Sequence, residues 1–158
     1  MDYVIRPLSP QDESILWDMV YQGLQSGQET NAPSREILKG PEFSRYVEGW
    51  GRPGDAGFVA HDRATQKPLG AVWCRLSNAV APSEGGEAVP ELAWSVDPQH
   101  RRRGIGAALM TQWVKANPHQ SAVRLAVPAT NPAVRLYERF GFSVAREEPR
   151  AVTMRRAV

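Results

Sequence analysis

One short segment of the sequence joins a predicted strand to a predicted helix and combines three arginines with two glycines. It reads Arg101-Arg102-Arg103-Gly104-Ile105-Gly106-Ala107. The first backbone N–H groups of a helix have no partner within it, so residues 103–107 are expected to form an anion site. Glycine leaves the backbone open to an oxyanion, and arginine supplies charge-assisted hydrogen bonds. The segment therefore predicts a phosphate-binding loop.

Two common phosphate-binding motifs do not fit this loop. A Walker loop needs Gly-Lys-Ser/Thr, whereas Gly106 is followed by two alanines. A dinucleotide-binding fingerprint needs a third glycine, and Leu109 stands at that position. The other interpretation of the three arginines is a solvated basic turn or a nucleic-acid patch. The formal net charge of only +2 weighs against nucleic acid.

The spacing Arg101-x-x-Gly104-x-Gly106, after a strand that ends Val96-Asp97-Pro98, resembles motif A of the GNAT superfamily of acyl-CoA-dependent N-acyltransferases. Downstream, Asn131-Pro132-Ala133-Val134-Arg135-Leu136-Tyr137-Glu138-Arg139-Phe140-Gly141-Phe142 resembles motif B of the same superfamily. Arg102 departs from motif A, because many members have glycine there. The resemblance covers nearly the whole chain, so we expect a single GNAT-like N-acetyltransferase domain over residues 1–158.

The resemblance implies a cleft for acetyl-CoA between two parallel strands that end at Val96 and Val127 and splay apart there. Pantetheine would pair along the first strand, whose backbone N–H would polarise the thioester carbonyl, and the pyrophosphate would lie on the basic loop. Asn131 would cap its helix and also bind the cofactor. The implied cofactor-binding residues are Val96, Arg101, Arg102, Arg103, Gly104, Ile105, Gly106, Ala107 and Asn131.

Tyr137 is the candidate catalytic acid, by its match to the tyrosine of motif B. A phenol has an ordinary pKa of about 10, so it is protonated at neutral pH and can donate to a departing thiolate. The alternative interpretation is a core aromatic, because Val134 and Phe140 share its face of the predicted helix.

Glu91 is the candidate general base. It stands at the start of the strand that leads to Val96, where some members of the superfamily carry a catalytic glutamate. A base is useful because an alkyl ammonium with a pKa of about 10 must lose a proton before it attacks. The alternative interpretation is a surface carboxylate, and Glu84 and Glu87 are weaker candidates for the base.

Hydrophobic patterning predicts the elements that position these residues. The order β-α-α-β-β-β-α-β-α-β-β predicts an α/β fold with a mixed, mostly antiparallel sheet of six to seven strands, a central parallel β-α-β cleft and about four helices. Strands are expected at residues 3–8, 57–60, 69–76, 91–96, 122–127, 142–145 and 152–155. Helices are expected at residues 11–25, 34–50 (broken by Gly40-Pro41), 104–116 and 131–140.

Composition limits the class of protein. With 158 residues, 42% hydrophobic and 23% charged, the chain suits one globular domain. Cys74 is the only cysteine, which excludes an intramolecular disulfide, and we expect it to be a buried thiol. The three histidines show no metal-ligand spacing, so no metal is expected. Neither a membrane span nor a signal-like segment is evident, which favours a cytoplasmic protein.

The sequence therefore predicts an N-acetyltransferase that moves an acetyl group from acetyl-CoA to a primary amine of a small molecule or protein, by direct attack in a ternary complex. The alternative is an acyl-CoA-binding regulatory module without turnover. Residues 21–55 and 77–90 are expected to select the acceptor, with Trp17 and Trp50 as candidate linings. No nucleic-acid or membrane partner is expected, and a homodimer is left open.

Overall fold

The computed structural model describes residues 2–23, 35–76, 89–101 and 103–157. Its seven strands form one sheet in the order β1-β2-β3-β4-β5-β7-β6. The only parallel neighbours among the described strands are β4 and β5. This confirms the predicted mixed, mostly antiparallel sheet. The strands are β1 Tyr3–Pro7, β2 Ala56–Asp62, β3 Pro68–Arg75, β4 Glu91–Val96, β5 Ala122–Leu125, β6 Ser143–Glu148 and β7 Ala151–Arg155.

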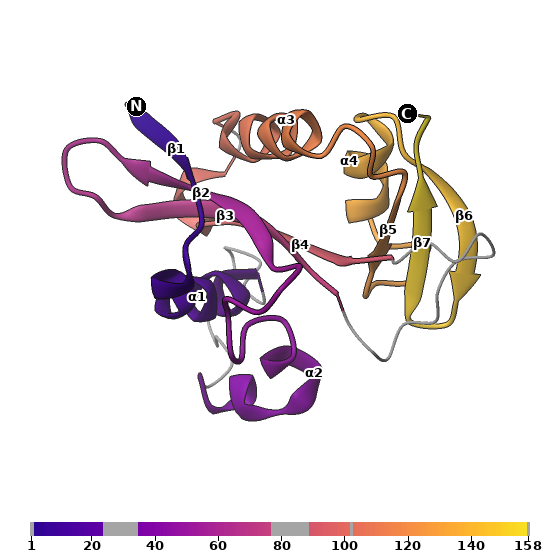
Figure 1. The fold of residues 1–158 in the computed structure, drawn as a ribbon, viewed down its shortest axis with the longest axis horizontal. Helices are drawn as coiled ribbons and strands as arrows, with labels where there is room; N and C mark the ends of the chain where they lie inside the picture. Colours follow the sequence, from indigo (N-terminus) through magenta and orange to yellow (C-terminus); the bar gives the residue numbers. More distant parts are fainter. Residues whose placement is uncertain (1, 24–34, 77–88, 102, 158) are drawn as a thin grey trace.

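Helices cover both faces of the sheet. The long ones are α1 Glu13–Gly23 and α3 Ile105–Ala116, and the short ones are α2 Pro41–Ser44 and α4 Ala133–Glu138. Helices α1 and α2 lie on one face, and α3 and α4 lie on the other (Figure 1). Within the described ranges, no helix is both long enough and apolar enough to cross a membrane.

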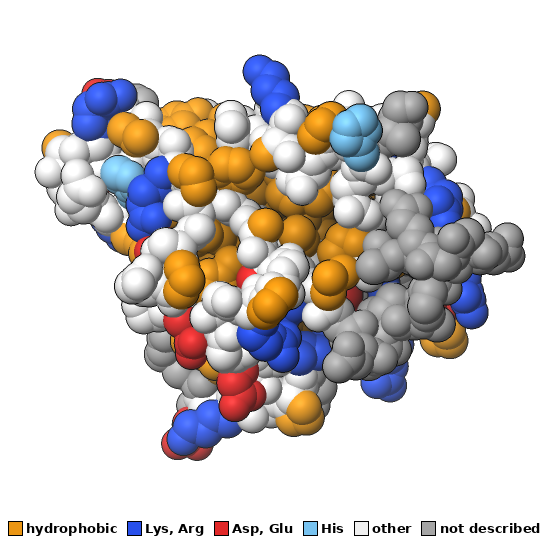
Figure 2. All heavy atoms as spheres, in the orientation of Figure 1, with side chains coloured by type: hydrophobic (Ala, Val, Ile, Leu, Met, Phe, Trp, Pro, Cys, Tyr) orange, Lys and Arg blue, Asp and Glu red, His pale blue; other side chains and the backbone are white. Residues whose placement is uncertain are grey.

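Each face of the sheet has its own hydrophobic core. The core under α3 and α4 includes Leu109, Trp113 and Tyr137, and Figure 2 shows hydrophobic side chains filling the space between α3 and the sheet. The core under α1 includes Leu16 and Trp73. The sheet is thus buried on both sides, which is why β3 is an almost unbroken apolar run.

The predicted order of elements is confirmed, and the differences concern the bounds of individual helices and strands. The expected helix at 34–50 is a 3₁₀ turn at Arg35–Lys39 followed by α2, because Gly40 and Pro41 separate the two. Strand β5 ends at Leu125 rather than Val127. Asn131 does cap α4, since its side-chain oxygen accepts the Ala133 N–H at 2.8 Å, although the helix begins at Ala133.

The two parallel strands pair at one position, which is the first residue of β4 and the third of the four residues of β5. Their register holds one pair, Glu91 opposite Arg124, whereas β3 and β4 pair over six residues. The Arg124 guanidinium also donates to the Glu91 carboxylate. Beyond this pair β4 and β5 separate, so the cleft expected between parallel strands is present.

A buried ion pair fastens the segment after α2 to β3. Arg75 donates through Nε and Nη2 to the two carboxylate oxygens of Asp55 at 2.9 and 2.8 Å. Its Nη1 donates to the backbone carbonyls of Arg45 and Glu48 at 3.1 and 2.7 Å. Because Arg75 is 4% exposed, all of these bonds form away from solvent. This network places the residues around Tyr46 beside the sheet.

The entry into α1 is held by a second ion pair, which predicts a pH dependence of stability. Arg6 donates to both carboxylate oxygens of Asp12 at 2.8 and 2.9 Å, and these bonds lower the pKa of Asp12 to about 2. A lowered carboxyl pKa adds stability above the unfolded value of about 4 and loses it as the pH falls toward 2.

We expect Asp12→Asn to lose about 1 to 2 kcal/mol of unfolding free energy at pH 6, and the difference from wild type to shrink as the pH falls toward 2. Urea unfolding at several pH values measures this difference. Asp2→Asn is the control, because its ion pair with Arg63 is exposed and worth little. A pH-independent difference at Asp12 would contradict the assignment.

Candidate active site

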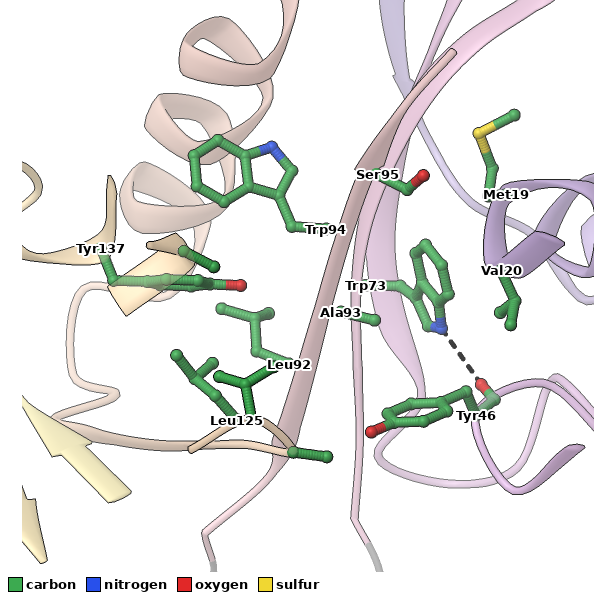
Figure 3. Close-up of a pocket in the computed structure, with 13 residues that line it drawn as sticks. Met19, Val20, Tyr46, Trp73, Leu92, Ala93, Trp94, Ser95, Leu125 and Tyr137 are labelled. Atoms are coloured by element: carbon green, nitrogen blue, oxygen red, sulfur yellow. Dashed lines mark hydrogen bonds between the residues drawn. The ribbon is translucent and has the colours of Figure 1, made fainter. Parts of the chain in front are cut away.

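The separation of β4 from β5 leaves a cleft of about 230 Å³. Its walls include β4 from Leu92 to Ser95 and the segment from Leu125 to Val127. Side chains of a strand alternate between faces. Accordingly Leu92 and Trp94 point toward α3 and α4, while Ala93 and Ser95 point toward α1 (Figure 3). The cleft is therefore lined by side chains from both faces of the sheet.

Tyr137 of α4 lies on one side of this cleft. Its ring packs edge-on against Trp94 and Phe142, with centroids 5.3 and 6.2 Å apart, and the residue is 4% exposed. Burial, and secondarily the nearby Tyr46, raises the pKa of the Tyr137 phenol far above 10. Figure 3 shows its hydroxyl directed toward β4. Tyr137 is thus a core aromatic whose neutral hydroxyl lies at the cleft.

Tyr46 and Trp73 lie on the other side, and sequence reasoning missed both. The Trp73 indole N–H donates to the Tyr46 carbonyl at 3.0 Å, across 27 residues of chain. Arg45 Nη2 donates to the Tyr46 hydroxyl oxygen at 3.2 Å. Met19 and Val20 of α1 complete this side (Figure 3). Only the general expectation that residues 21–55 select the acceptor pointed to Tyr46.

Glu91 lies at the closed end of the cleft. Glu91 is 5% exposed. Its carboxylate forms ion pairs with Arg124 and, at 3.2 Å, with Arg45. Arg124 also reaches Glu148 of β6 at 3.3 Å. Glu91 is therefore a buried, doubly paired carboxylate rather than the surface carboxylate that was the alternative interpretation. The weaker candidates Glu84 and Glu87 lie outside the described residues.

The basic loop connects the end of β4 to α3. Arg101 Nε donates to the Val96 carbonyl at 3.1 Å, so this arginine holds the loop against the strand end. Gly104 has φ +79°, a left-handed conformation that favours glycine, and it caps α3 without a side chain. The first amides of α3, at Ile105, Gly106 and Ala107, therefore have no side-chain cap. Arg103 is exposed, and Arg102 lies outside the described residues.

Gly106 has a packing role that the sequence did not reveal. A Cβ added there would lie 3.3 Å from the Trp94 ring and 3.4 Å from Val96. The missing side chain thus brings α3 close to β4, whereas a Cβ on Gly104 would meet nothing within 4 Å. Gly106 thus has a packing reason to lack a side chain, and the expectation that both glycines keep space open for an anion stays a prediction.

Other expected residues have structural positions. Trp50 is 7% exposed and donates to the Ser9 carbonyl, and Trp17 donates to Glu13, so neither lines the cleft. Cys74 is buried, as expected, and burial raises the pKa of its thiol. Within the described part of the chain, no three His, Cys, Asp or Glu side chains gather as metal ligands.

Comparison with known proteins identifies the family. The profile of the acetyltransferase (GNAT) domain matches residues 53–144, which is more than half of the chain. The chain belongs to the GNAT acetyltransferase family. A GNAT domain is an acyl-CoA-dependent acetyltransferase, so the cleft between β4 and β5 is the candidate place of acetyl transfer. No curated protein sequence matches the chain detectably.

Solved structures share the fold across the whole chain. A histone acetyltransferase HPA2-related protein from Corynebacterium glutamicum is 18% identical, with a TM-score of 0.67 over 100% of this chain and 98% of that one. A PaiA N-acetyltransferase from Thermoplasma acidophilum, solved with coenzyme A, is 16% identical, with a TM-score of 0.64 over 99% and 100%. A ribosomal-protein-alanine N-acetyltransferase from Brucella melitensis is 18% identical, with a TM-score of 0.65 over 98% and 99%. At these identities the likeness establishes the GNAT fold.

The packing of Gly106 generates a prediction about stability. Gly106→Val should lower the unfolding free energy by about 1 to 3 kcal/mol, because the added methyl groups collide with Trp94 and Val96. Ala107→Val is the matched control, since Ala107 is the next residue of the same helix and is exposed. This substitution should lower the unfolding free energy by less than about 1 kcal/mol. Equal losses in urea unfolding would show that Gly106 is not a packing position.

Proposed function

We propose that this GNAT protein transfers the acetyl group of acetyl-CoA to a primary amine by direct attack in a ternary complex. The observation that supports this most is the neutral, buried Tyr137 at a cleft that is lined from both faces of the sheet. One face can take the thioester while the other admits the amine. Direct attack needs this arrangement, because both substrates must be bound at once.

Acetyl-CoA is the acetyl donor in this proposal. The amides of Ile105, Gly106 and Ala107, with the guanidinium groups of Arg101 to Arg103, would bind the pyrophosphate. An uncapped twelve-residue helix and an exposed Arg103 fit an anionic ligand there. Val96 would offer backbone groups to the pantetheine arm, because no described strand pairs with β4 beyond its first residue on that side. Asn131, which caps α4, is the remaining proposed contact.

The proposed reaction forms a C–N bond and breaks a C–S bond. The neutral amine attacks the thioester carbonyl, the tetrahedral intermediate expels the thiolate, and Tyr137 donates its proton to sulfur. The amine nitrogen gives up a proton to solvent or to a base, and Tyr137 regains its proton from solvent. A phenol that burial keeps protonated suits the donor role.

Glu91 remains the proposed base, and its ion pairs define the test. A carboxylate that is already paired with Arg124 and Arg45 must keep a lone pair free to take the amine's proton, directly or through water. The competing role is structural, since the same carboxylate closes the end of the cleft. The two roles differ in what Glu91→Gln should do to the pH profile.

Tyr137→Phe tests the acid. Release of free thiol from acetyl-CoA with a panel of primary amines should show turnover in the wild type and a fall of about 100-fold or more in kcat in the variant. The acetyl-CoA-induced rise in Tm should persist, because the lost interaction matters mainly when sulfur is negative. Stability should change by no more than about 1 kcal/mol.

Full activity in Tyr137→Phe would make Tyr137 a packing residue and assign the proton donor to solvent. Binding of acetyl-CoA without thiol release from any amine, in the wild type, would instead support an acyl-CoA-binding regulatory module. If acetyl-CoA did not raise the Tm of the wild type, the proposed cofactor site itself would be wrong.

Glu91→Gln tests the base against the structural role. As a base, Glu91 should show a lower kcat, a flattened acidic limb of the pH profile and an unchanged acetyl-CoA Tm shift. As a structural group, it should lose about 3 kcal/mol or more of stability, because Arg124 loses a buried partner. Glu148→Gln is the control, since Glu148 also pairs with Arg124 but is more exposed.

A further inference from the structure

The cleft has a second wall that the proposed chemistry at Tyr137 does not use. This α1-side wall consists of Met19, Val20, Tyr46, Trp73 and Ala93. It lies across β4 from Tyr137, on the face that α1 and α2 cover (Figures 1 and 3). An acceptor that meets the thioester from the opposite face of the sheet must pass along this wall.

The α1-side wall is apolar. It combines a thioether, a branched aliphatic side chain, a methyl group and two aromatic rings. Its polar groups, within the described residues, are the Tyr46 hydroxyl and the neighbouring Ser95 hydroxyl. Ser95 is 9% exposed, and its buried oxygen has no hydrogen-bond partner among the described residues. A buried hydroxyl without a partner is costly, so it is a candidate contact for a polar ligand atom.

The charges beside the wall are already neutralised. Glu91 is paired with Arg45 and Arg124, and Arg124 also reaches Glu148. Two acidic and two basic side chains thus form one connected group of ion pairs, in which the charges balance. A polyamine or a basic peptide would need a free carboxylate, and a carboxylate-bearing acceptor would need a free guanidinium. The described residues of the wall provide neither.

Tyr46 is held so that its hydroxyl can still bind a ligand. Arg45 donates one hydrogen bond to the hydroxyl oxygen, which has a second lone pair for an amine N–H. Burial, followed by the charge of Glu91, raises the pKa of this phenol, so the hydroxyl stays neutral. Its backbone is fixed by the Trp73 indole.

We infer that the acceptor of this enzyme is a primary amine carried on a compact, uncharged apolar body that packs against Val20 and Trp73, with the Tyr46 and Ser95 hydroxyls contacting its nitrogen. This inference rests on the proposed acetyl transfer and narrows it to one substrate class. The cleft supports a compact body because its 230 Å³ is shared with the acetyl group, whereas pockets that enclose drug-sized ligands hold roughly 300 Å³ or more.

Matched pairs of amines test this substrate class by thiol release from acetyl-CoA. 2-Phenylethylamine should exceed ethylamine in kcat/KM by about tenfold or more, because its ring is buried against the wall. Butylamine should exceed 1,4-diaminobutane by a similar factor, because the second ammonium finds no carboxylate. A peptide with N-terminal alanine is the protein-like comparison. Preference for the diamine or the peptide would overturn the inference.

Val20→Asp tests the wall itself. The new carboxylate should lower kcat/KM for 2-phenylethylamine about tenfold or more and remove the preference for butylamine over 1,4-diaminobutane. Ile15→Asp is the matched control, since Ile15 is half-buried on the same helix and does not line the cleft. The acetyl-CoA Tm shift shows that each variant is folded. If Val20→Asp does not fold, Val20→Phe should instead penalise 2-phenylethylamine more than ethylamine.

Tyr46→Phe tests the contact to the amine. It should raise KM for the amine several-fold while the acetyl-CoA Tm shift is unchanged, and Tyr137→Phe should lower kcat instead. Unchanged amine preference in both Val20 variants would overturn the inference while acetyl transfer stands. Absence of thiol release from every amine would defeat the proposed function, and the acceptor inference with it.

Discussion

The ion pair between Glu91 and Arg124 is the constraint on which the site depends. These residues form the one register pair that joins β4 to β5, and their side chains join the same two strands. The pair joins the first residue of β4 to the third residue of β5, and beyond it the two chains are free to diverge as the sheet twists. The cleft is therefore a property of the backbone that does not require a flexible loop, and the carboxylate of Glu91 lies at its closed end.

The same carboxylate links the cleft to the other face of the sheet. Glu91 forms an ion pair with Arg45, and Arg45 donates to the Tyr46 hydroxyl, so the closed end and the α1-side wall share one set of charges. Arg75 adds a second anchor, because it binds the Arg45 carbonyl and the buried Asp55 together. One buried ion pair, Arg75 with Asp55, and one partly exposed pair, Arg45 with Glu91, thus fix a segment that has little regular secondary structure of its own. Removing one partner of the buried pair leaves an unpaired charge, so such a substitution should destabilise the fold.

The sequence predicted most of the fold and only half of the site. Strand β4 and helix α3 were predicted to within a residue, because their hydrophobic periodicity and the Asp97-Pro98 and Asn117-Pro118 signals are local. Tyr137 was found through a motif. Tyr46 and Trp73 were missed because they meet through a hydrogen bond across 27 residues, and no local pattern records that contact. Gly106 was assigned to the anion loop alone, because its contact with Trp94 depends on how α3 lies on the sheet.

The two tyrosines place neutral hydroxyl groups on both sides of one cleft. Tyr137 is buried and Tyr46 is partly buried. Burial is the main cause that raises the pKa of both phenols; Tyr46 adds to this effect on Tyr137, and the charge of Glu91 adds to it on Tyr46. A phenolate on either side would therefore be unfavourable before the reaction begins. In the proposed reaction, the phenolate that Tyr137 forms when it donates to sulfur would therefore be short-lived. The low polarity that keeps both hydroxyls protonated would also limit the water that could hydrolyse the thioester, so in the proposed reaction the apolar walls would serve both proton donation and acceptor selection.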